Sequence, residues 1–254
     1  MAVDPAQVLT QRWLAWHEAR EAAVTAPHGL AALDATHWLT TEFQAYDGAP
    51  GRWRHDGEAV HAKDLPLAEI ESTVDLTGPL AEGDSFRYRG SQFLVFARDG
   101  APALRQYDPE AVRRKNIDGI DAWQPDPAWL VPATWTPSTD GTTVKVTAID
   151  GYVSGEVPTG YLTLTLDGQE LRLTTTGTPD HPKIVFSDGT SGNEGYRFRF
   201  LQLDEVLGEH PHVDFNRAYL PPCAFSDHYV CPMPLPENRL PVPVRAGERG
   251  IRHG

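Results

Sequence analysis

A strand, a tight turn and a return strand can be read directly from the middle of the chain. Residues 161–166 alternate leucine with threonine, Asp167-Gly168 follows, and residues 170–175 form a second β-like run. Asp-Gly between two such runs favours the two-residue turns whose backbone twist matches that of paired strands. This segment therefore predicts an antiparallel hairpin and constrains the surrounding fold to antiparallel β-structure.

Several further segments have the composition and period of β-strands. They are residues 86–98, which read FRYRG and then FLVFAR, and residues 142–149, 183–187 and 196–203. Glycine and proline separate these short runs, which is typical of antiparallel sheets that close into barrels or pack as sandwiches. We predict a mainly β fold, an antiparallel barrel or sandwich, with an N-terminal α-helix and a C-terminal proline-rich strap.

Sustained helical periodicity is confined to the start of the chain. Apolar side chains recur at helical spacing at Leu9, Trp13, Trp16 and Ala23. Asp4 can cap the helix with Pro5 in its first turn, and the sequence Pro-His-Gly at 27–29 ends the pattern. We predict one amphipathic helix over about residues 4–26. Its tryptophans favour core packing, with a platform for a ligand as the alternative.

The 254 residues suffice for one large β domain or two small ones. We predict a single domain over residues 1–254, with the helix at about 4–26, a β core at about 50–217 and the strap at 218–249. A connection rich in proline and tryptophan, WQPDPAWLVPATW, could instead divide the chain into two domains. Its tryptophans favour burial against both sides.

Charge limits the partners that this chain can bind. The net charge of -13 opposes nucleic acid and anionic membrane surfaces, so we expect neither as a partner. The first residues lack the basic and apolar regions of a signal peptide, and no apolar run reaches the roughly 20 residues that span a bilayer. We expect a soluble, cytoplasmic protein. Two cysteines are too few for a disulfide scaffold.

The stretch from His212 to Glu248 has no regular period and contains both cysteines. Long irregular connections inside compact domains are uncommon, and those that exist are usually functional or disordered. Prolines recur between Pro221 and Pro243 among apolar side chains, which are too many for a solvated tail. We predict a rigid, ordered strap over the core.

Polar residues alternate with apolar ones at the beginning of this stretch. His212, Asp214 and Asn216 would share one face of an extended segment, while Val213 and Phe215 would point into the core. A carboxylate, an imidazole and an amide on one wall could form a base with its orienting partners. The alternative is a strand that turns its polar face to water.

Two further motifs could bind an anion. The turn at residues 188–193, DGTSGN, places Thr190 and Ser191 among glycines whose backbone N–H groups could converge, with Arg199 and Arg217 as candidate cations. A tight hairpin explains the same residues. Asn238-Arg239 lies between prolines, which would present the guanidinium to a carboxylate or phosphate. An internal pair with Asp214 or Glu237 is the alternative.

The remaining candidates are two cysteines and one histidine. Cys223 and Cys231 could close a loop as a disulfide, respond to oxidation, act as a nucleophile, or bind a metal with nearby histidines, but zinc sites normally show tighter spacing and a second ligand pair. We expect two small, reduced, buried thiols and assign no metal site. His37 has apolar neighbours, so it either makes a buried hydrogen bond or faces a pocket. No serine-hydrolase motif occurs.

The quoted motifs resemble a known family. DFNRAY, PPCAF, CPMPLPENRLPV and AGE, preceded by PHGLAALDATHWL, RQYDPEA and FSDGTSGNEGY, look like the signature of the domain-of-unknown-function 1684 family of bacterial and archaeal proteins. The resemblance covers roughly residues 15–249. The family usually has one more residue between its TSG and Arg-Phe-Leu than this chain has before Arg199. The resemblance implies a fold and a site, without an activity.

We hypothesise an enzyme or binding protein for a small polar, anionic molecule, held between the DFNR strand, the TSG turn and the ENR strap. The candidate catalytic residues are Asp214, Asn216 and His37, and the candidate ligand-binding residues are Thr190, Ser191, Arg199, Arg217, Tyr219, Asn238 and Arg239. The alternatives are a flavin-binding split barrel and a noncatalytic scaffold whose signature only locks the fold. The sequence names no cofactor and leaves the oligomeric state open, a homodimer included.

Overall fold

The computed structural model describes residues 5–139, 141–203, 208 and 210–254. Its contacts divide the chain into two compact units. The first unit contains Met1–Glu21, Asp118–Ala224 and Val230–Gly254, and the second contains Ala22–Ile117 and Phe225–Tyr229. The chain therefore passes from the first unit to the second and back twice. The single domain over residues 1–254 stays a prediction.

The N-terminal helix α1 spans Pro5–Thr25, which confirms the helix expected over about residues 4–26. Asp4, its predicted cap, lies outside the described residues. The helix is followed by Gly29, where a Cβ atom would lie 2.2 Å from the carbonyl oxygen of Ala23. Only glycine fits this close approach of the chain to the helix end. None of the helices within the described ranges is long and apolar enough to cross a membrane.

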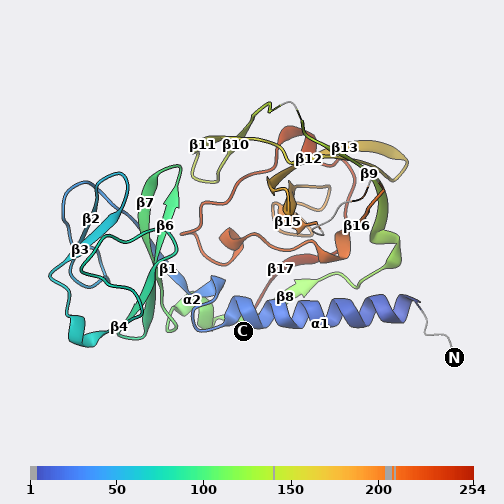
Figure 1. Cartoon of the computed structure of the whole chain (residues 1–254). Helices are drawn as coiled ribbons and strands as arrows, with labels where there is room; N and C mark the ends of the chain where they lie inside the picture. Colours follow the sequence, from blue (N-terminus) through green and yellow to red (C-terminus); the bar gives the residue numbers. More distant parts are fainter. Residues whose placement is uncertain (1–4, 140, 204–207, 209) are drawn as a thin grey trace. The chain divides into compact units, whose positions relative to one another are not determined.

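The second unit is built on a five-stranded antiparallel sheet with the order β1-β7-β6-β5-β4 (Figure 1). Its strands are β1 (Leu33–Trp38), β4 (Ile70–Ser72), β5 (Ser85–Tyr88), β6 (Ser91–Arg98) and β7 (Ala101–Tyr107). The other elements are the paired strands β2 (Arg52–His55) and β3 (Val60–Lys63), the turns η1 (Leu30–Ala32) and η2 (Leu67–Glu69), and α2 (Val112–Lys115). The rings of Trp53, Phe86 and Phe93 stack in its core, with centroids 5.4 and 5.1 Å apart.

The first unit contains a six-stranded antiparallel sheet that curves into a half-barrel. The strand order is β15-β14-β13-β12-β9-β16. The strands are β9 (Leu130–Pro137), β12 (Gly160–Leu166), β13 (Gln169–Thr178), β14 (His181–Phe186), β15 (Arg199–Gln202) and β16 (His212–Asp214). The predicted mainly β, antiparallel fold is therefore confirmed.

The predicted hairpin is the central pair of this sheet. Leu166 of β12 pairs with Gln169 of β13, and the two turn residues Asp167 and Gly168 have φ values of 49° and 72°. Positive φ at both positions is the requirement of a type I′ turn, which Asp-Gly meets with little strain. The leucines of β12 are buried, so the alternation seen in the sequence correctly assigns its inner face.

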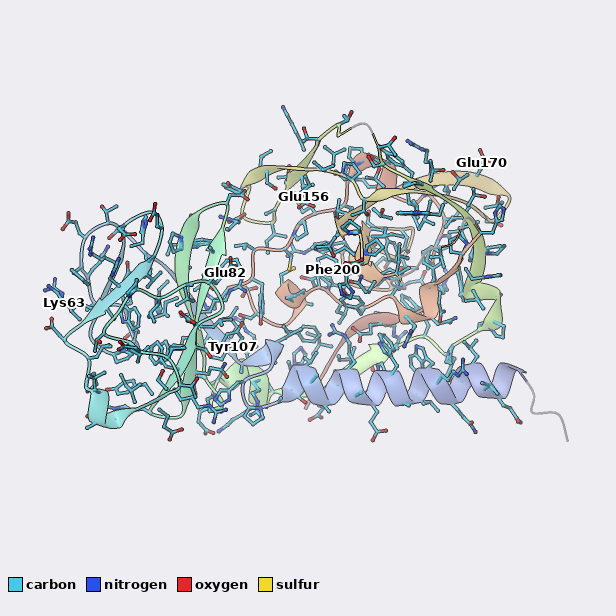
Figure 2. The ribbon with its side chains drawn as sticks, in the orientation of Figure 1. Lys63, Glu82, Tyr107, Glu156, Glu170 and Phe200 are labelled. Carbon is cyan, nitrogen blue, oxygen red and sulfur yellow. The ribbon has the colours of Figure 1, made fainter. Side chains whose placement is uncertain are left out.

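Shorter elements complete the first unit. They are the pair β8 (Ile117–Ala122) and β17 (Glu248–His253), the pair β10 (Val144–Thr147) and β11 (Val153–Glu156), and the turns η3 (Pro127–Trp129), η4 (Phe215–Arg217), η5 (Pro222–Ala224) and η6 (Pro236–Asn238). Figure 2 shows Glu170 at the outside of this unit and Phe200 in its interior. Glu170 is exposed and Phe200 is buried, as their polarity predicts.

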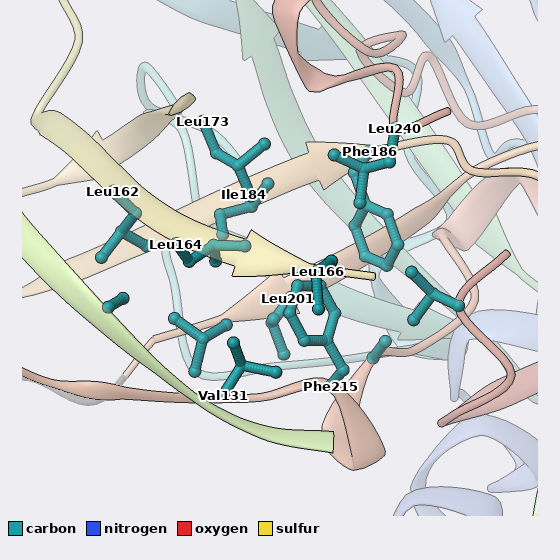
Figure 3. Packing of buried hydrophobic residues seen from close by; sticks show 14 of the residues in the cluster. Val131, Leu162, Leu164, Leu166, Leu173, Ile184, Phe186, Leu201, Phe215 and Leu240 are labelled. Carbon is teal, nitrogen blue, oxygen red and sulfur yellow. The ribbon is translucent and has the colours of Figure 1, made fainter. Parts of the chain in front are cut away.

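The proline-rich strap is ordered and forms part of the core. Leu240, Val242, Val244 and Ala246 are buried, whereas the residues between them are exposed. These side chains join one cluster with the inner face of the sheet, including Leu162 and Leu201 (Figure 3). The strap therefore has the side-chain alternation of a strand. Both cysteines are free and buried, as expected.

Two segments differ from the sequence-based expectation. The tryptophan-rich connection contains strand β9. Its Pro132 does not disrupt the pairing with β12, because the residues of β9 that pair with β12 begin at the next residue, Ala133. The segment that begins at His212 is extended only as far as Asp214. Asn216 belongs to the 3-10 turn η4 instead, so the expected shared polar face of three residues is wrong.

Candidate functional site

A buried ion pair joins the TSG turn to the neighbouring strand. Nη2 of Arg199 lies 2.6 Å from Oδ2 of Asp188, and the two side chains are 1% and 0% exposed. Burial lowers the pKa of Arg199 from its ordinary value, and the Asp188 carboxylate opposes this effect. A charge removed from water needs such a partner and further hydrogen bonds to be tolerated.

Arg199 and Asp188 use their remaining hydrogen-bonding capacity on the strap. Arg199 donates to the carbonyl oxygens of Val244, at 2.8 Å, and of Ala246. Asp188 Oδ1 accepts from the N–H of Val244 at 3.2 Å and from both the N–H and the hydroxyl of Thr190 at 2.7 Å. The ion pair therefore binds the strap to the sheet, and Thr190 serves the same network.

The backbone of the TSG turn is bonded within itself. Each N–H group from Thr190 to Gly195 donates to an acceptor of residues 188–195. The hydroxyl of Ser191 accepts from the N–H of Asp188 at 3.0 Å. No convergent set of N–H groups is left in this turn for an anion, and the tight-hairpin interpretation of the motif fits its geometry.

Asn216 connects η4 to two distant segments. Its side-chain amide accepts from the N–H of Asp126 at 2.9 Å and donates to the Asp126 carbonyl at 3.0 Å. Oδ1 of Asp214 accepts from both the N–H and Nδ2 of Asn216, and the Asn216 carbonyl accepts from Nε1 of Trp13 at 2.6 Å. Asn216 is completely buried, so Asp214 and Asn216 do meet, but as a hydrogen-bonded link between α1, η4 and the segment before η3.

Asn238 plays a similar part between two strands. Its side chain accepts from the N–H of Thr174 at 2.9 Å and donates to the carbonyls of Thr174, at 2.9 Å, and Val185, at 3.1 Å. It thereby satisfies backbone groups where β13 and β14 diverge. The neighbouring Arg239 is exposed and forms no ion pair within the part of the chain that the structure describes. The internal pairs of Arg239 considered from the sequence are not formed.

The other candidates lie apart from these networks. Arg217 is exposed, with its guanidinium carbon 5.8 Å from the ring centre of Trp16. Tyr219 lies under Arg20, whose guanidinium carbon is 4.7 Å from the ring centre, and burial raises the pKa of Tyr219. His37 belongs to the second unit, where it lies on β1.

His37 is half-buried against Tyr46, with ring centres 5.3 Å apart. Burial lowers the pKa of His37. Its Nε2 atom has no hydrogen-bond partner among the described residues. The structure thus joins Asp188, Thr190, Ser191 and Arg199 in one network, joins Asp214 to Asn216 in another, and leaves Asn238 in a third.

Sequence reasoning missed the partners of these residues. Asp188, the partner of Arg199, belongs to the turn motif but was not among the candidate residues. The available signal was its position as the first carboxylate after an apolar strand. Glu248 is completely buried and lies 2.9 Å from Nε of Arg20. Its only signal was its place in the AGE motif.

One hollow of the first unit lies beside these networks, where the strap meets the sheet. It has a volume of about 490 Å³ and is lined by η3, by β9, by the end of β12 and by the strap at Val242 and Pro243. A second hollow of about 480 Å³ is lined by β9, β12 and two histidines, His210 and His212. None of the ten candidate site residues lines either hollow. Across the described ranges, no three His, Cys, Asp or Glu residues are arranged to hold a metal ion.

Comparison with known proteins identifies a family. The family described as "Protein of unknown function (DUF1684)" matches residues 115–249. Among solved structures, the chain is similar to an uncharacterized protein of Haloarcula marismortui, with 32% identity, a TM-score of 0.44, and coverage of 52% of this chain and 76% of that one. No curated protein matches the chain.

Proposed function

Because this chain belongs to the DUF1684 family, to which no function is assigned, we propose from its geometry that the first unit binds a small molecule in the hollow beside the strap. The observation that carries this proposal is the position of Val242 and Pro243. They line the hollow, and residues of the TSG turn hold the backbone on either side of Pro243 by hydrogen bonds. Gly189 donates to the Val242 carbonyl at 3.0 Å, and Asp188 accepts from the Val244 N–H.

In this proposal the signature residues shape the site without touching the ligand. Arg199 holds the strap at Val244 and Ala246, immediately after the pocket wall. Buried, fully bonded polar networks specify one arrangement of the segments that they join. The same hydrogen bonds support the simpler alternative of a noncatalytic scaffold, which differs in predicting that the hollow binds nothing.

The pocket lining indicates the chemistry of the ligand. The walls include Trp129, Val131, Leu166, Val242 and Pro243, and among the described residues of the lining only Asp167 is ionisable. Mostly apolar hollows of 300–1,000 Å³ with a few polar groups are typical of small-molecule sites. The lining therefore favours a flat, largely apolar molecule with a hydrogen-bond donor or a positive charge near Asp167.

The anionic ligand expected from the sequence has less support. An anion needs free cations, but Arg199 is bonded to Asp188, and neither Arg217 nor Arg239 lines the hollow. The flavin alternative depended on the same arginines and on the TSG turn, whose N–H groups are already bonded. One carboxylate without a partnering acid or base in the lining favours binding over catalysis.

The proposal can be tested with three probes that share one ring. Isotope-labelled protein would be titrated with 2-naphthylmethylamine, 2-naphthylmethanol and 2-naphthoate while amide shifts are followed by NMR. We expect shifts in η3, at the β12–β13 turn and at Val242 and Val244, strongest for the amine and weakest for the carboxylate. Tightest binding by naphthoate would instead restore the anionic site, and shifts confined to other segments would refute the pocket.

A variant that fills the hollow supplies the control. Ala128 is an exposed residue of the lining, so Ala128→Trp should block the probes with little effect on the core. Ala22→Trp adds the same ring at an exposed position of α1, outside the lining, and should leave binding unchanged. Equal binding by both variants would contradict the proposed location.

A further inference from the structure

The two cysteines meet on the first unit at the base of a short loop. The backbone N–H of Cys223 donates to Sγ of Cys231 at 3.3 Å. The chain leaves the first unit after Ala224 and returns at Val230, so the thiols lie on either side of this excursion. The position of Cys231 is fixed in turn by its carbonyl, which accepts from the N–H of Ile149 at 3.0 Å.

The sulfur of Cys231 therefore lies close to the backbone of Cys223. The Cα of Cys223 is only about 1.5 Å from its own nitrogen, which is within 3.3 Å of that sulfur. Disulfides form between residues whose Cα atoms are some 4.4–6.8 Å apart. The side chains of Cys223 and Cys231 also share a hydrogen bond, so the two thiols are neighbours in the folded protein.

The surroundings of Cys223 favour its thiolate form. The hydroxyl of Tyr196 donates to the Cys223 carbonyl at 3.2 Å and to its Sγ at 3.8 Å, and Arg197 adds a positive charge. A hydrogen bond from Cys231, together with these two residues, lowers the pKa of Cys223 to about 7, although burial opposes the change. Burial raises the pKa of Tyr196 to about 12, so that its hydroxyl stays protonated and remains a donor.

We propose that Cys223 and Cys231 form a peroxide-reactive dithiol site, in which Cys223 is the attacking residue, Cys231 resolves the product as a disulfide, and Tyr196 and Arg197 position and activate the thiolate. This site lies outside the proposed small-molecule pocket, since none of its four residues lines that hollow. It requires a hydroperoxide as the oxidant.

The chemistry balances in two steps. The Cys223 thiolate attacks one oxygen of the peroxide, an S–O bond forms, the O–O bond breaks, and the leaving oxygen takes a proton to become an alcohol or water. The Cys231 sulfur then attacks the sulfenic acid, an S–S bond forms, and hydroxide leaves with the thiol proton as water. Two electrons pass from the thiols to the peroxide. An external dithiol then reduces the disulfide back to two thiols and is itself oxidised to a disulfide.

Burial limits which reagents reach the site. The cysteines are 4% and 5% exposed, so a compact oxidant should reach them far more readily than a bulky thiol reagent. This combination of an activated thiolate and restricted access distinguishes the site from an exposed, generally reactive cysteine. A purely structural pair of thiols would react with neither.

The test uses the whole protein and hydrogen peroxide. After treatment at neutral pH, intact mass spectrometry should show the loss of two hydrogens, peptide mapping should locate a bond between Cys223 and Cys231, and dithiothreitol should reverse it. The rate should fall about tenfold per pH unit below the pKa of Cys223, because the thiolate is the nucleophile. Thiols that react only after unfolding in urea, or Cys223 that proceeds to a sulfonic acid with Cys231 still reduced, would overturn the proposal.

Variants assign the separate roles. Cys231→Ser should stop at a sulfenic acid on Cys223, which dimedone traps once the oxidised protein is unfolded in its presence. Cys223→Ser should yield no such adduct. Tyr196→Phe and Arg197→Gln should slow oxidation and move its pH profile upward, whereas Tyr161→Phe should not. Tyr161 is a matched control because Arg172 lies over its ring at 3.7 Å with no thiol in the pair. An unchanged pH profile in folded Arg197→Gln would refute the activating role, even if Tyr196→Phe failed to fold.

Discussion

Nε of Arg20 in helix α1 lies 2.9 Å from Oε1 of Glu248 in strand β17, so one ion pair joins two elements that are more than 200 residues apart in the sequence. Oε2 of Glu248 accepts from the N–H of Leu220 at 2.7 Å, and Arg20 donates to the Leu220 carbonyl at 2.9 Å. One residue of the strap thus has both backbone groups bonded to this ion pair. The arrangement satisfies a carboxylate that is completely buried.

We expect Glu248 to make the free energy of unfolding depend on pH. Burial raises its pKa above the ordinary value, and the contact with Arg20 opposes this effect only in part. The folded state then binds a proton more readily than the unfolded state. The stability that protonated Glu248 contributes is therefore fully present below the pKa of the unfolded state and is lost as pH rises through the pKa of the folded state. Glu248→Gln should therefore gain stability relative to the native protein as pH rises. The free energies of unfolding of the native protein and of Glu248→Gln would be measured with denaturant across this pH range. If the two curves stay parallel, the prediction for Glu248 is wrong.

The Asp188–Arg199 pair should couple strongly. Arg199→Met leaves the Asp188 carboxylate buried and unpaired, which should lower the free energy of unfolding by about 3–5 kcal/mol. Asp188→Asn combined with Arg199→Met should cost less than the sum of the single changes. Urea unfolding of the double-mutant cycle measures this coupling. Arg245→Met, which breaks the exposed pair with Glu194, is the control and should barely change stability.

Asn238 and Arg239 are adjacent, but truncation of Asn238 should cost much more stability than truncation of Arg239. Asn238→Ala leaves backbone groups of Thr174 and Val185 without partners and should destabilise the protein by about 3 kcal/mol. Arg239→Ala removes an exposed side chain and should change stability by less than about 0.5 kcal/mol. Thermal melts of both variants measure the two losses of stability. A large loss on Arg239→Ala would show a contact that the structure does not contain.

His37 should add a second pH dependence, with the opposite sign to that of Glu248. Burial lowers its pKa below the ordinary value of 6.5, so the stability that it contributes is present above that value and is lost as pH falls below it. His37→Gln should lose less stability than the native protein between about pH 7 and 5. Unfolding followed through the second unit's tryptophan fluorescence measures this difference. A larger loss in the variant would contradict the assignment.

The fold could be predicted where the signal is local. The leucine–threonine alternation of β12 and the Asp-Gly turn need no information from distant residues, and neither does the tryptophan spacing of α1. β9 was missed because a proline in a strand is tolerated wherever its missing N–H has no partner, and this depends on the neighbouring strand. The 3-10 turn at Phe215–Arg217 is capped locally by Asp214, but the side chain of Asn216 bonds Asp126, 90 residues away in the sequence.

The site was harder to predict because ligand-binding and fold-locking residues look the same in a sequence. A buried asparagine beside prolines could bind a ligand or satisfy a strand edge, and only the position of Thr174 shows that Asn238 does the latter. The partner of Arg199 lies nearby in sequence, but the strap carbonyls that it holds are 45 and 47 residues away. The hollow beside the strap involves mostly apolar residues, which carry no distinguishing motif.

The bond between Arg20 and Glu248 also sets the order of events during synthesis. On the ribosome, α1 is translated before its partners Asn216, Leu220 and Glu248, which follow it by 200 residues or more. Contacts separated by more than 200 residues cannot form while the intervening chain is still being made. Helix α1 must therefore wait with Trp13 unburied while the second unit's sheet is completed, and the first unit can close only when translation has passed Glu248.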